Sequence, residues 1–351
     1  MQIERFEARK REHILQSLDL AHQASGLNGL DRVRLIHEAL PDLNFEDINV
    51  ATACLGKKLA TPFYVAGMTA GHPDAVLLNR RIASLCQKRG WAMGIGSQRR
   101  QLEEFQNGSS EGIDQWKRLR EEAPDLVLFA NVGIAQLIPA RIEHLKALVE
   151  SISAQALVVH LNSLQEVIQK EGTPQFKGGF AALKKCCEEL RTPVIVKETG
   201  CGFSPDTLTR LATLQLGGVD VSGLGGTHWG RIEGARAGSN SLEAQVSATF
   251  ANWGESTVSS VISAKETLPQ SIQIWASGGV RSGLDAAKLI AIGATRVGYA
   301  QPVLKAALEG EAKLDQWMQI QEYELRVALF CTGSASCENL RGKERIWTIA
   351  N

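Results

Sequence analysis

Eight short apolar runs, each followed by a stretch with helical periodicity, constrain the fold of this chain more strongly than any other feature. The runs are rich in β-branched residues, end in small or polar residues, and occupy residues 62–68, 91–94, 125–131, 156–162, 193–198, 218–222, 272–277 and 295–299. They are nearly continuous rather than alternating, which is typical of parallel strands buried on both faces. Helical patterns fall between them at 79–89, 140–151, 180–190, 205–214 and 284–292.

Eight successive strand-then-helix units predict an α/β fold of the (β/α)8 (TIM) barrel type. A doubly wound open sheet is the alternative. That fold usually has fewer strands and a G-x-G-x-x-G turn after its first strand, and no such turn follows residues 62–68. The barrel is therefore the stronger prediction.

The 351 residues are enough for such a barrel with additions at both ends. We expect an N-terminal extension over residues 1–60, with a charged helical segment at 5–22 and no barrel strand. The barrel would occupy 61–305 and a C-terminal helical tail 306–351, helical to about residue 330 and then rich in Gly and Ser. Two medium-sized domains are the competing division for a chain of this length.

The balance of charges and the cysteine pattern exclude several classes of protein. With 38 basic and 38 acidic residues the formal net charge is zero, which argues against general binding of nucleic acid or membrane surfaces. The seven cysteines are odd in number and contain no C-x-x-C pair, so we expect reduced thiols and a cytoplasmic protein. Residues 1–13 are charged rather than apolar, and no apolar run approaches the roughly 20 residues of a membrane span, so neither a signal peptide nor a transmembrane helix is expected.

Polar or small residues follow every predicted strand, and in a barrel these positions form the active site. The loop Ser277–Arg281 after the seventh strand has two adjacent glycines, which allow backbone N–H groups to approach a phosphate closely. The helix that follows adds its positive N-terminal end, and phosphate sites after strands seven and eight recur in barrels. The loop therefore predicts a phosphate-bearing cofactor; an ordinary glycine turn is the alternative.

Three other residues at strand ends have chemistry of interest. Lys197 could pair with an anionic ring or a phosphate or form a Schiff base, or it could form an ion pair with Glu198 or a neighbouring carboxylate. His160 could be a general acid or base or a hydrogen-bond donor, although a lone histidine is more often a satisfied core residue. Glu166 could hold Mg2+ jointly with a diphosphate, or simply favour the start of a helix. The basic cluster Arg9-Lys10-Arg11 indicates by itself only a solvated helix face.

Taken together, the strand-end motifs resemble the type 2, flavin-dependent isopentenyl-diphosphate isomerase family. Ala-Ser-Gly-Gly also occurs in hydroxy-acid oxidases, but His-Leu-Asn-x-x-Gln-Glu combined with Gly-Ser-Gln-Arg and the N-terminal Arg-Lys is much more specific. The match runs from about residue 5 to residue 305. It is carried by Arg9-Lys10 with Glu12-His13, Met68-Thr69, Gly96-Ser97-Gln98-Arg99, Ala130-Asn131-Val132-Gly133, His160-Leu161-Asn162 with Gln165-Glu166, Val196-Lys197-Glu198, Asp220-Val221-Ser222-Gly223 with Gly225-Gly226-Thr227, Ala276-Ser277-Gly278-Gly279-Val280-Arg281, and Ala300-Gln301.

The resemblance implies a homo-oligomeric FMN barrel, a tetramer or octamer, that interconverts isopentenyl and dimethylallyl diphosphate with reduced FMN, Mg2+ and NADPH as the flavin reductant. Mg2+ would be held by Glu166. Substrate would contact Arg9, Lys10, Ser97, Gln98, Arg99, His160, Asn162 and Gln165. FMN would contact Met68, Thr69, Ala70, Ser97, Asn131, Lys197, Ser222, Thr227, Gly278, Gly279, Arg281, Ala300 and Gln301.

One position departs from the family pattern, because Ala70 stands where relatives commonly have glycine. The added methyl group could narrow the approach of the backbone to the flavin, although we expect it to be tolerated.

The same resemblance implies roles in catalysis. Reduced FMN would act as the acid–base group, and the protein would chiefly orient it. Gln165 would position the substrate or relay a proton, and His160 and Asn162 would hydrogen-bond the diphosphate. Arg9, Lys10 and Arg99 would neutralise it, so the N-terminal segment would have to fold over the barrel mouth of its own or a neighbouring subunit.

Two other functions remain open from the sequence. An FMN-dependent 2-hydroxy-acid oxidase or dehydrogenase on the same barrel would need a base histidine and a pair of arginines for the substrate carboxylate. A catalytically inactive barrel that binds a metabolite and regulates a partner is the other alternative.

Overall fold

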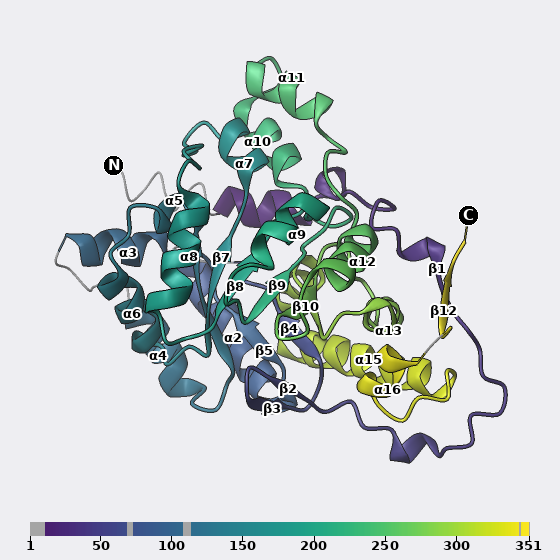
Figure 1. The fold of residues 1–351 in the computed structure, drawn as a ribbon. Coiled ribbons are helices and arrows are strands. Elements are labelled where there is room, and N and C mark those ends of the chain that lie inside the picture. The colour runs from purple at the N-terminus through teal and green to yellow at the C-terminus, as the bar shows by residue number, and fades with distance from the viewer. Residues whose placement is uncertain (1–10, 69–72, 108–113, 344, 351) are drawn as a thin grey trace.

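The eight apolar runs form one closed parallel barrel (Figure 1). The computed structural model describes residues 11–68, 73–107, 114–343 and 345–350. Strands that follow each other in the sequence are neighbours in the barrel, and β11 closes the ring against β4. The strands are β4 (Phe63–Val65), β5 (Ala92–Gly94), β6 (Leu128–Gly133), β7 (Ala156–His160), β8 (Val194–Lys197), β9 (Gly218–Asp220), β10 (Gln273–Ala276) and β11 (Arg296–Tyr299). The predicted fold is confirmed.

Helices surround the barrel and shield the outer faces of its strands (Figure 1). The helices after the first strand and before the last are α2 (Pro73–Arg89), α3 (Arg99–Gln106), α4 (Asp114–Glu122), α5 (Ile134–Leu137), α6 (Ile142–Ser151), α7 (Ser163–Ile168), α8 (Gly179–Glu189), α9 (Pro205–Leu211), α10 (Trp229–Ala237), α11 (Leu242–Thr249), α12 (Thr257–Thr267) and α13 (Gly283–Ile292). The five predicted helical patterns correspond to α2, α6, α8, α9 and α13.

Helix α13 illustrates why these sequences form helices. Ser282 caps the helix by accepting a hydrogen bond from the backbone N–H of Asp285, whose carboxylate accepts one from the backbone of Ser282. This capping box satisfies two N–H groups that would otherwise lack partners. Leu289, Ile290 and Ile292 are fully buried, and each such side chain stabilises the fold by about 1.5–3 kcal/mol.

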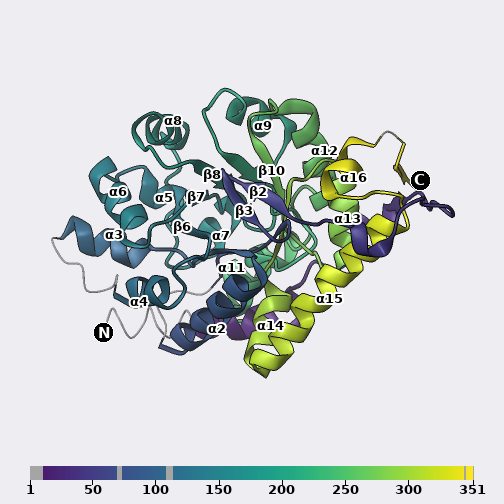
Figure 2. The same ribbon diagram turned by 90° about the horizontal axis from the view of Figure 1, so that it is seen from below.

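The inside of the barrel holds a second, separate apolar cluster that is built around aromatic rings. The ring of Trp275 lies 5.1 Å from that of Tyr64 and 5.0 Å from that of Phe129. A hairpin of β2 (Thr52–Cys54) and β3 (Lys57–Leu59) adds Cys54 and Leu59 to this cluster. Figure 2 shows the hairpin lying across the lower end of the barrel.

The two terminal regions pack on the barrel and on each other. Residues 11–18 are helical, followed by the short 3-10 helices η1 (Leu20–His22), η2 (Leu30–Arg32) and η3 (Phe45–Asp47). Strand β1 (Val33–Leu35) pairs antiparallel with β12 (Trp347–Ile349) near the other end of the chain. None of the described residues before 61 belongs to a barrel strand.

The C-terminal region is helical as expected, over α14 (Gln301–Glu309) and α15 (Glu311–Phe330). Gly310 interrupts them with a positive φ of 131°. Helix α16 (Cys337–Gly342) and β12 were not predicted, because the first is short and the second depends on a partner more than 300 residues away. No helix among the described residues is long and apolar enough to cross a membrane.

Candidate active site

A cavity opens at the C-terminal ends of the barrel strands, where barrel active sites lie. It gathers residues from nearly every strand end and from the helix 11–18. Four of the predicted site residues, Arg9, Lys10, Thr69 and Ala70, lie outside the described residues. Those that line the cavity are Met68, Ser97, Arg99, Asn131, His160, Asn162, Gln165, Glu166, Lys197, Ser222, Thr227, Gly278, Gly279, Arg281, Ala300 and Gln301.

One side of the cavity is formed by closely packed glycine-rich turns, which we call the loop region: residues 198–202, 222–227 and 277–281. Gly278 and Gly279 have positive φ values of 105° and 75°. A Cβ atom on either would collide with the backbone of the 223–226 turn, so only glycine fits. Within the described part of the chain, the backbone N–H groups of Gly278, Gly279 and Val280 have no hydrogen-bond acceptor. Neighbouring N–H donors without partners suit an anion.

Arg281 adds a positive charge beside these donors. Its guanidinium donates to the side-chain oxygens of Gln23 at 3.1 Å and Gln301 at 3.3 Å. Burial lowers the pKa of Arg281, and the nearby carboxylate of Asp285 opposes that shift. Gln301 is the first residue of α14, whose N-terminus borders the cavity together with Ala300. Backbone donors, an arginine and a helix N-terminus form the kind of site that holds a phosphate group.

The N-terminal segment of the same chain closes part of the cavity. Gln23 pairs with Thr227 in an isolated antiparallel bridge, and its amide donates to the hydroxyl of Thr227 at 3.1 Å. His13, Ile14 and Ser17 on the preceding helix line the cavity. The described part of the N-terminal segment therefore folds over its own barrel mouth.

Lys197 ends β8 and its side chain borders the cavity. Its ammonium group donates to the carbonyl of Glu198 at 2.6 Å and to the hydroxyl of Ser222 at 3.0 Å. The structure therefore does not bring Lys197 into an ion pair with the Glu198 carboxylate. Glu198 instead accepts backbone N–H groups of its own turn, including that of Thr199 at 2.5 Å.

His160 and Asn131 form a pair with a defined orientation. The amide nitrogen of Asn131 donates to the carbonyl of Ile95 at 3.0 Å, so its oxygen faces the imidazole. Nδ1 of His160 lies 2.8 Å from that oxygen and must carry the proton. In the neutral ring, Nε2 is then the acceptor nitrogen.

Gln98 is placed behind Asn131 rather than in the cavity. Its side chain is fully buried, and its oxygen accepts the backbone N–H of Asn131 at 3.1 Å. In this structure Gln98 supports a cavity residue, while its predicted contact with substrate stays a prediction.

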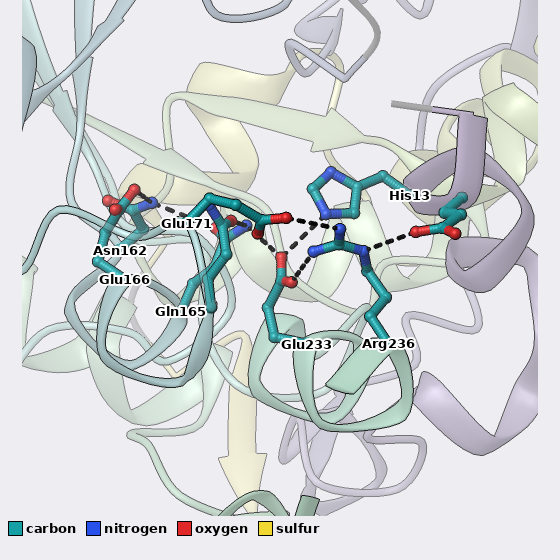
Figure 3. Close-up of polar contacts among 9 residues, drawn as sticks. His13, Asn162, Gln165, Glu166, Glu171, Glu233 and Arg236 are labelled. Carbon is teal, nitrogen blue, oxygen red and sulfur yellow. Dashed lines mark hydrogen bonds and ion pairs between the residues drawn. The ribbon is translucent and has the colours of Figure 1, made fainter. Parts of the chain in front are cut away.

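The other side of the cavity is a chain of side-chain contacts, which we call the polar network (Figure 3): His13, Asn162, Gln165, Glu166, Glu171, Glu233 and Arg236. Asn162 donates to Gln165 at 3.2 Å and to Glu166 at 2.8 Å. Glu166 is buried, and its second oxygen accepts the backbone N–H of Thr173 at 2.5 Å. Gln165 in turn donates to Glu233 on α10 at 3.1 Å.

Glu233 is the centre of this network. Its carboxylate is almost fully buried and contacts His13 at 2.9 Å and Arg236 at 2.5 Å, in addition to Gln165. Burial alone would raise the pKa of Glu233, but the hydrogen bond and charge of His13 and the charge of Arg236 outweigh it, and the pKa lies below its ordinary value. The carboxylate is therefore ionised near neutral pH and fixes the Gln165 amide.

Two glycines allow α10 to approach its neighbours closely enough for these contacts. A Cβ on Gly230 would press on Leu164 of α7, and one on Gly234 would collide with Ser247 of α11. Small residues four apart on one helix face permit such close packing. Glu233 lies between them and reaches Gln165 across the α7–α10 contact.

Sequence reasoning did not assign several residues that border the cavity or hold its side chains. They are far from the strand ends or belong to loops with weak patterns: His13, Ile14, Ser17, Gln136, Gln169, Thr199, Trp229 and Glu233. His13 belongs to the Glu12-His13 motif, and the Gly-x-x-x-Gly spacing around Glu233 is a usable signal. The His13 ring packs edge-on against Trp229 at 5.0 Å.

The donor set around Glu166 bears on the predicted metal. No group of three or more His, Cys, Asp or Glu side chains suited to a metal was found within the described ranges. A single carboxylate is not a protein cage for Mg2+, but it fits an ion that takes most of its ligands from a phosphorylated substrate and water.

Comparison with known proteins identifies the family to which the chain belongs. Residues 117–348 match the model of the FMN-dependent dehydrogenase family. The isopentenyl-diphosphate delta-isomerase of Legionella pneumophila (strain Corby) is 49% identical over 96% of this chain and 97% of its own length. The enzyme of the same name from Bdellovibrio bacteriovorus is 48% identical over 97% of this chain and 98% of its own.

Solved structures agree in fold. A mandelate oxidase variant with (S)-mandelic acid matches with a TM-score of 0.66 at 17% identity, covering 100% of this chain and 98% of that one. Mandelate oxidase with (S)-2-phenylpropionate matches with a TM-score of 0.65 at 16% identity, covering 99% and 98%. At this identity the likeness supports the barrel fold alone. By the sequence comparisons, the chain belongs to the isopentenyl-diphosphate delta-isomerase family, within the wider FMN-dependent dehydrogenase family.

Proposed function

We propose that this protein is an FMN-dependent isomerase that interconverts isopentenyl and dimethylallyl diphosphate in isoprenoid biosynthesis. The observation that carries the proposal is one cavity with two different sides. A phosphate-type site lies on the loop region, and an amide fixed by a buried carboxylate lies on the polar network. Membership of the isomerase family supports the interpretation of this pair as a cofactor site and a substrate site.

The loop region fits the phosphate of FMN. The N–H groups of Gly278 to Val280, the guanidinium of Arg281 and the N-terminus of α14 would hold it. Lys197, Ser222 and Asn131 would contact the ring system, with Met68, Ser97, Thr227, Ala300 and Gln301 around it; Thr69 and Ala70 complete the proposed set. Bound reduced FMN would supply an electron-rich ring and an exchangeable proton beside the substrate alkene.

The reaction adds a proton at one carbon and removes another proton two carbons away, with no net redox change. Gln165 would orient the alkene end, because Glu233 holds its amide in one position. His13 and Trp229 close the same side and would keep water from a cation-like centre. With its Nδ1 proton held by Asn131, His160 would donate to the diphosphate from Nε2 when that nitrogen is also protonated, and Asn162 would donate from its amide.

Basic residues would neutralise the diphosphate. Arg99 borders the cavity, and we propose that Arg9 and Lys10 join it from the N-terminal segment, with Ser97 and Gln98 nearby. Glu166 would hold Mg2+ against the diphosphate, exchanging its contacts with Asn162 or Thr173 for the ion.

The remaining features of the proposal follow the family. We propose a cytoplasmic homo-oligomer, a tetramer or octamer, whose flavin is reduced by NADPH, and which has neither nucleic acid nor membrane as a partner. Size-exclusion chromatography with light scattering tests the assembly, and bleaching of the 450 nm flavin band by NADPH without oxygen tests the reductant.

The test of function is incubation of the purified protein with FMN, dithionite, Mg2+ and isopentenyl diphosphate in D2O. We expect dimethylallyl diphosphate and deuterium uptake. Absence of both would refute the proposal, and oxygen uptake with 2-hydroxy acids would replace it with the oxidase alternative. Gln165→Asn should lose at least about 100-fold in turnover with FMN still bound, whereas Gln245→Asn on the exposed face of α11 should be unchanged. Loss of FMN from the first variant would mean that Gln165 is wrongly assigned.

A further inference from the structure

Asp220 is a buried carboxylate inside the barrel that the proposed function leaves without a role. It ends β9, is 1% exposed, and its backbone lies in register with Lys197 of β8. One oxygen accepts the hydroxyl of Tyr64 at 2.6 Å, and the other accepts the hydroxyl of Ser277 at 2.8 Å. Counting the backbone N–H of Ser222 at 3.3 Å, three donors surround this one carboxylate.

The position of Asp220 connects it to the floor of the cavity. A small chamber below the main cavity is lined by Asp220, Tyr64 and Trp275. The two spaces share Ala66, Gly67, Asn131 and Lys197 as lining residues. These shared residues, and no further protein layer, therefore separate the charge of Asp220 from a ligand in the main cavity.

Ser222 links the carboxylate to Lys197. Its φ of 37° is left-handed, which a residue other than glycine adopts only at a cost of about 1–2 kcal/mol. The contact of its N–H with Asp220 stabilises that conformation, and its hydroxyl then accepts the Lys197 ammonium at 3.0 Å. A strained backbone conformation held in this way at the edge of the cavity indicates that the position of the Ser222 hydroxyl matters for function.

The charges in this arrangement have a predictable effect on a bound ring system. The positive charge of Lys197 borders the cavity, and the negative charge of Asp220 lies beneath it. In the low dielectric of a barrel interior, each charge strongly alters the affinity for an anionic ligand relative to a neutral one. The Asp220 carboxylate therefore partly offsets the gain in affinity for an anionic ligand that the Lys197 ammonium provides.

We propose that Asp220 is a positioning residue that holds Ser222 and Lys197 and sets the field at the cavity floor, and thereby the relative affinity for reduced and oxidised flavin. The inference rests on the proposed binding of FMN. It assigns Tyr64 and Ser277 to the same device, as the donors that partly neutralise the carboxylate.

The experiment measures the midpoint potential of bound FMN by dye-coupled reduction, together with the dissociation constant of oxidised FMN, for the wild type, Asp220→Asn and Tyr64→Phe. Asp220→Asn removes the negative charge, so the affinity for reduced FMN should rise about tenfold relative to that for oxidised FMN, which raises the potential by about 30 mV. Tyr64→Phe keeps the charge but removes a donor that partly neutralises it, so the potential of this variant should fall.

The two variants distinguish charge from general damage. A shift in the same direction in both, or no shift in Asp220→Asn, would overturn the inference while leaving FMN binding established. Failure of the wild type to bind FMN would overturn the proposed function and this inference together. Should Asp220→Asn not fold, Ser277→Ala replaces it: a potential lower than that of the wild type supports the inference, and an equal or raised potential contradicts it.

Discussion

The loop region and the polar network border one cavity but are specified by different kinds of interaction. The loop region is backbone geometry: glycines that admit no Cβ and N–H groups that have no acceptor among the described residues. The polar network consists of side chains from three separate elements, joined through Glu233. The first depends on a few adjacent residues, whereas the second exists only after distant helices have packed.

The comparison predicts that the loop region tolerates almost no added volume. Gly279→Ala places a Cβ against the Gly225 carbonyl at a φ of 75°, whereas Gly26→Ala has nearly the same φ of 81° with nothing near the added atom. We expect Gly26→Ala to cost about 1–2 kcal/mol of unfolding free energy. Gly279→Ala should cost several kcal/mol more and weaken FMN binding at least 100-fold.

Urea unfolding and fluorescence titration of FMN measure the two effects. Equal losses of unfolding free energy in Gly279→Ala and Gly26→Ala would mean that the positive φ alone excludes a side chain at position 279. Contact between the 277–281 and 223–226 turns would then contribute nothing.

The turn after β8 predicts a pH dependence. Burial raises the pKa of Glu198 to about 7, against the backbone N–H groups of Cys201 and Thr199. A pKa above that of the unfolded chain means that this carboxyl supports the fold most below pH 4.5 and loses that support as pH rises through about 7. The loss corresponds to about 3 kcal/mol.

Glu198→Gln should remove this dependence. The unfolding free energy of the variant relative to the wild type should therefore increase between pH 5 and pH 8. If the unfolding free energies of the two proteins, measured in urea, changed equally with pH, the assignment of this pH dependence to Glu198 would be wrong.

The polar network predicts an asymmetry between two carboxylates that share Arg236. Glu233 is buried and has three partners, whereas Glu171 is half exposed and lies 3.5 Å from the guanidinium. Glu233→Ala should lower turnover about 100-fold, because Gln165 loses its anchor. Glu171→Ala should change it less than about twofold, as expected for a surface ion pair.

Steady-state kinetics at saturating FMN separate the two variants. The comparison between the regions would fail if Glu233→Ala released FMN, because the network would then support the cofactor as well.

The smallest effect is expected from two adjacent arginines of α3. Arg99 and Arg100 make equivalent ion pairs with Glu103 and Glu104, at 2.8 and 2.9 Å, but only Arg99 borders the cavity. Arg99→Gln should raise KM for the diphosphate about tenfold, equal to roughly 1.4 kcal/mol, and Arg100→Gln should not. A similar rise in both would indicate a long-range charge effect, which added salt would abolish.

Much of the fold and part of the site could be predicted from sequence, for physical reasons. Strands buried on both faces leave continuous apolar runs, and all eight were located. The loop at Gly278 and Gly279 was predictable because its backbone geometry excludes every residue type other than glycine at these two positions.

Other features depend on contacts that no local pattern encodes. The pairing of β1 with β12 joins the two ends of the chain, and Gln98 faces Asn131 rather than the cavity because of how its turn is packed. Glu233 lies on a helix distant from any strand end, so its contact with Gln165 becomes visible only when α7 and α10 are in place.

The hairpin of β2 and β3 has a consequence for how molecules move through this protein. Arg296 fixes it from inside the barrel wall, with hydrogen bonds to Thr52 and Ala53, and the lower end is filled. Among the described residues, substrate and product would therefore enter and leave at the same end of the barrel, the end that the helix 11–18 borders. We expect exchange at this one end to limit turnover once the chemical step is fast, so added solvent viscosity should then slow the reaction.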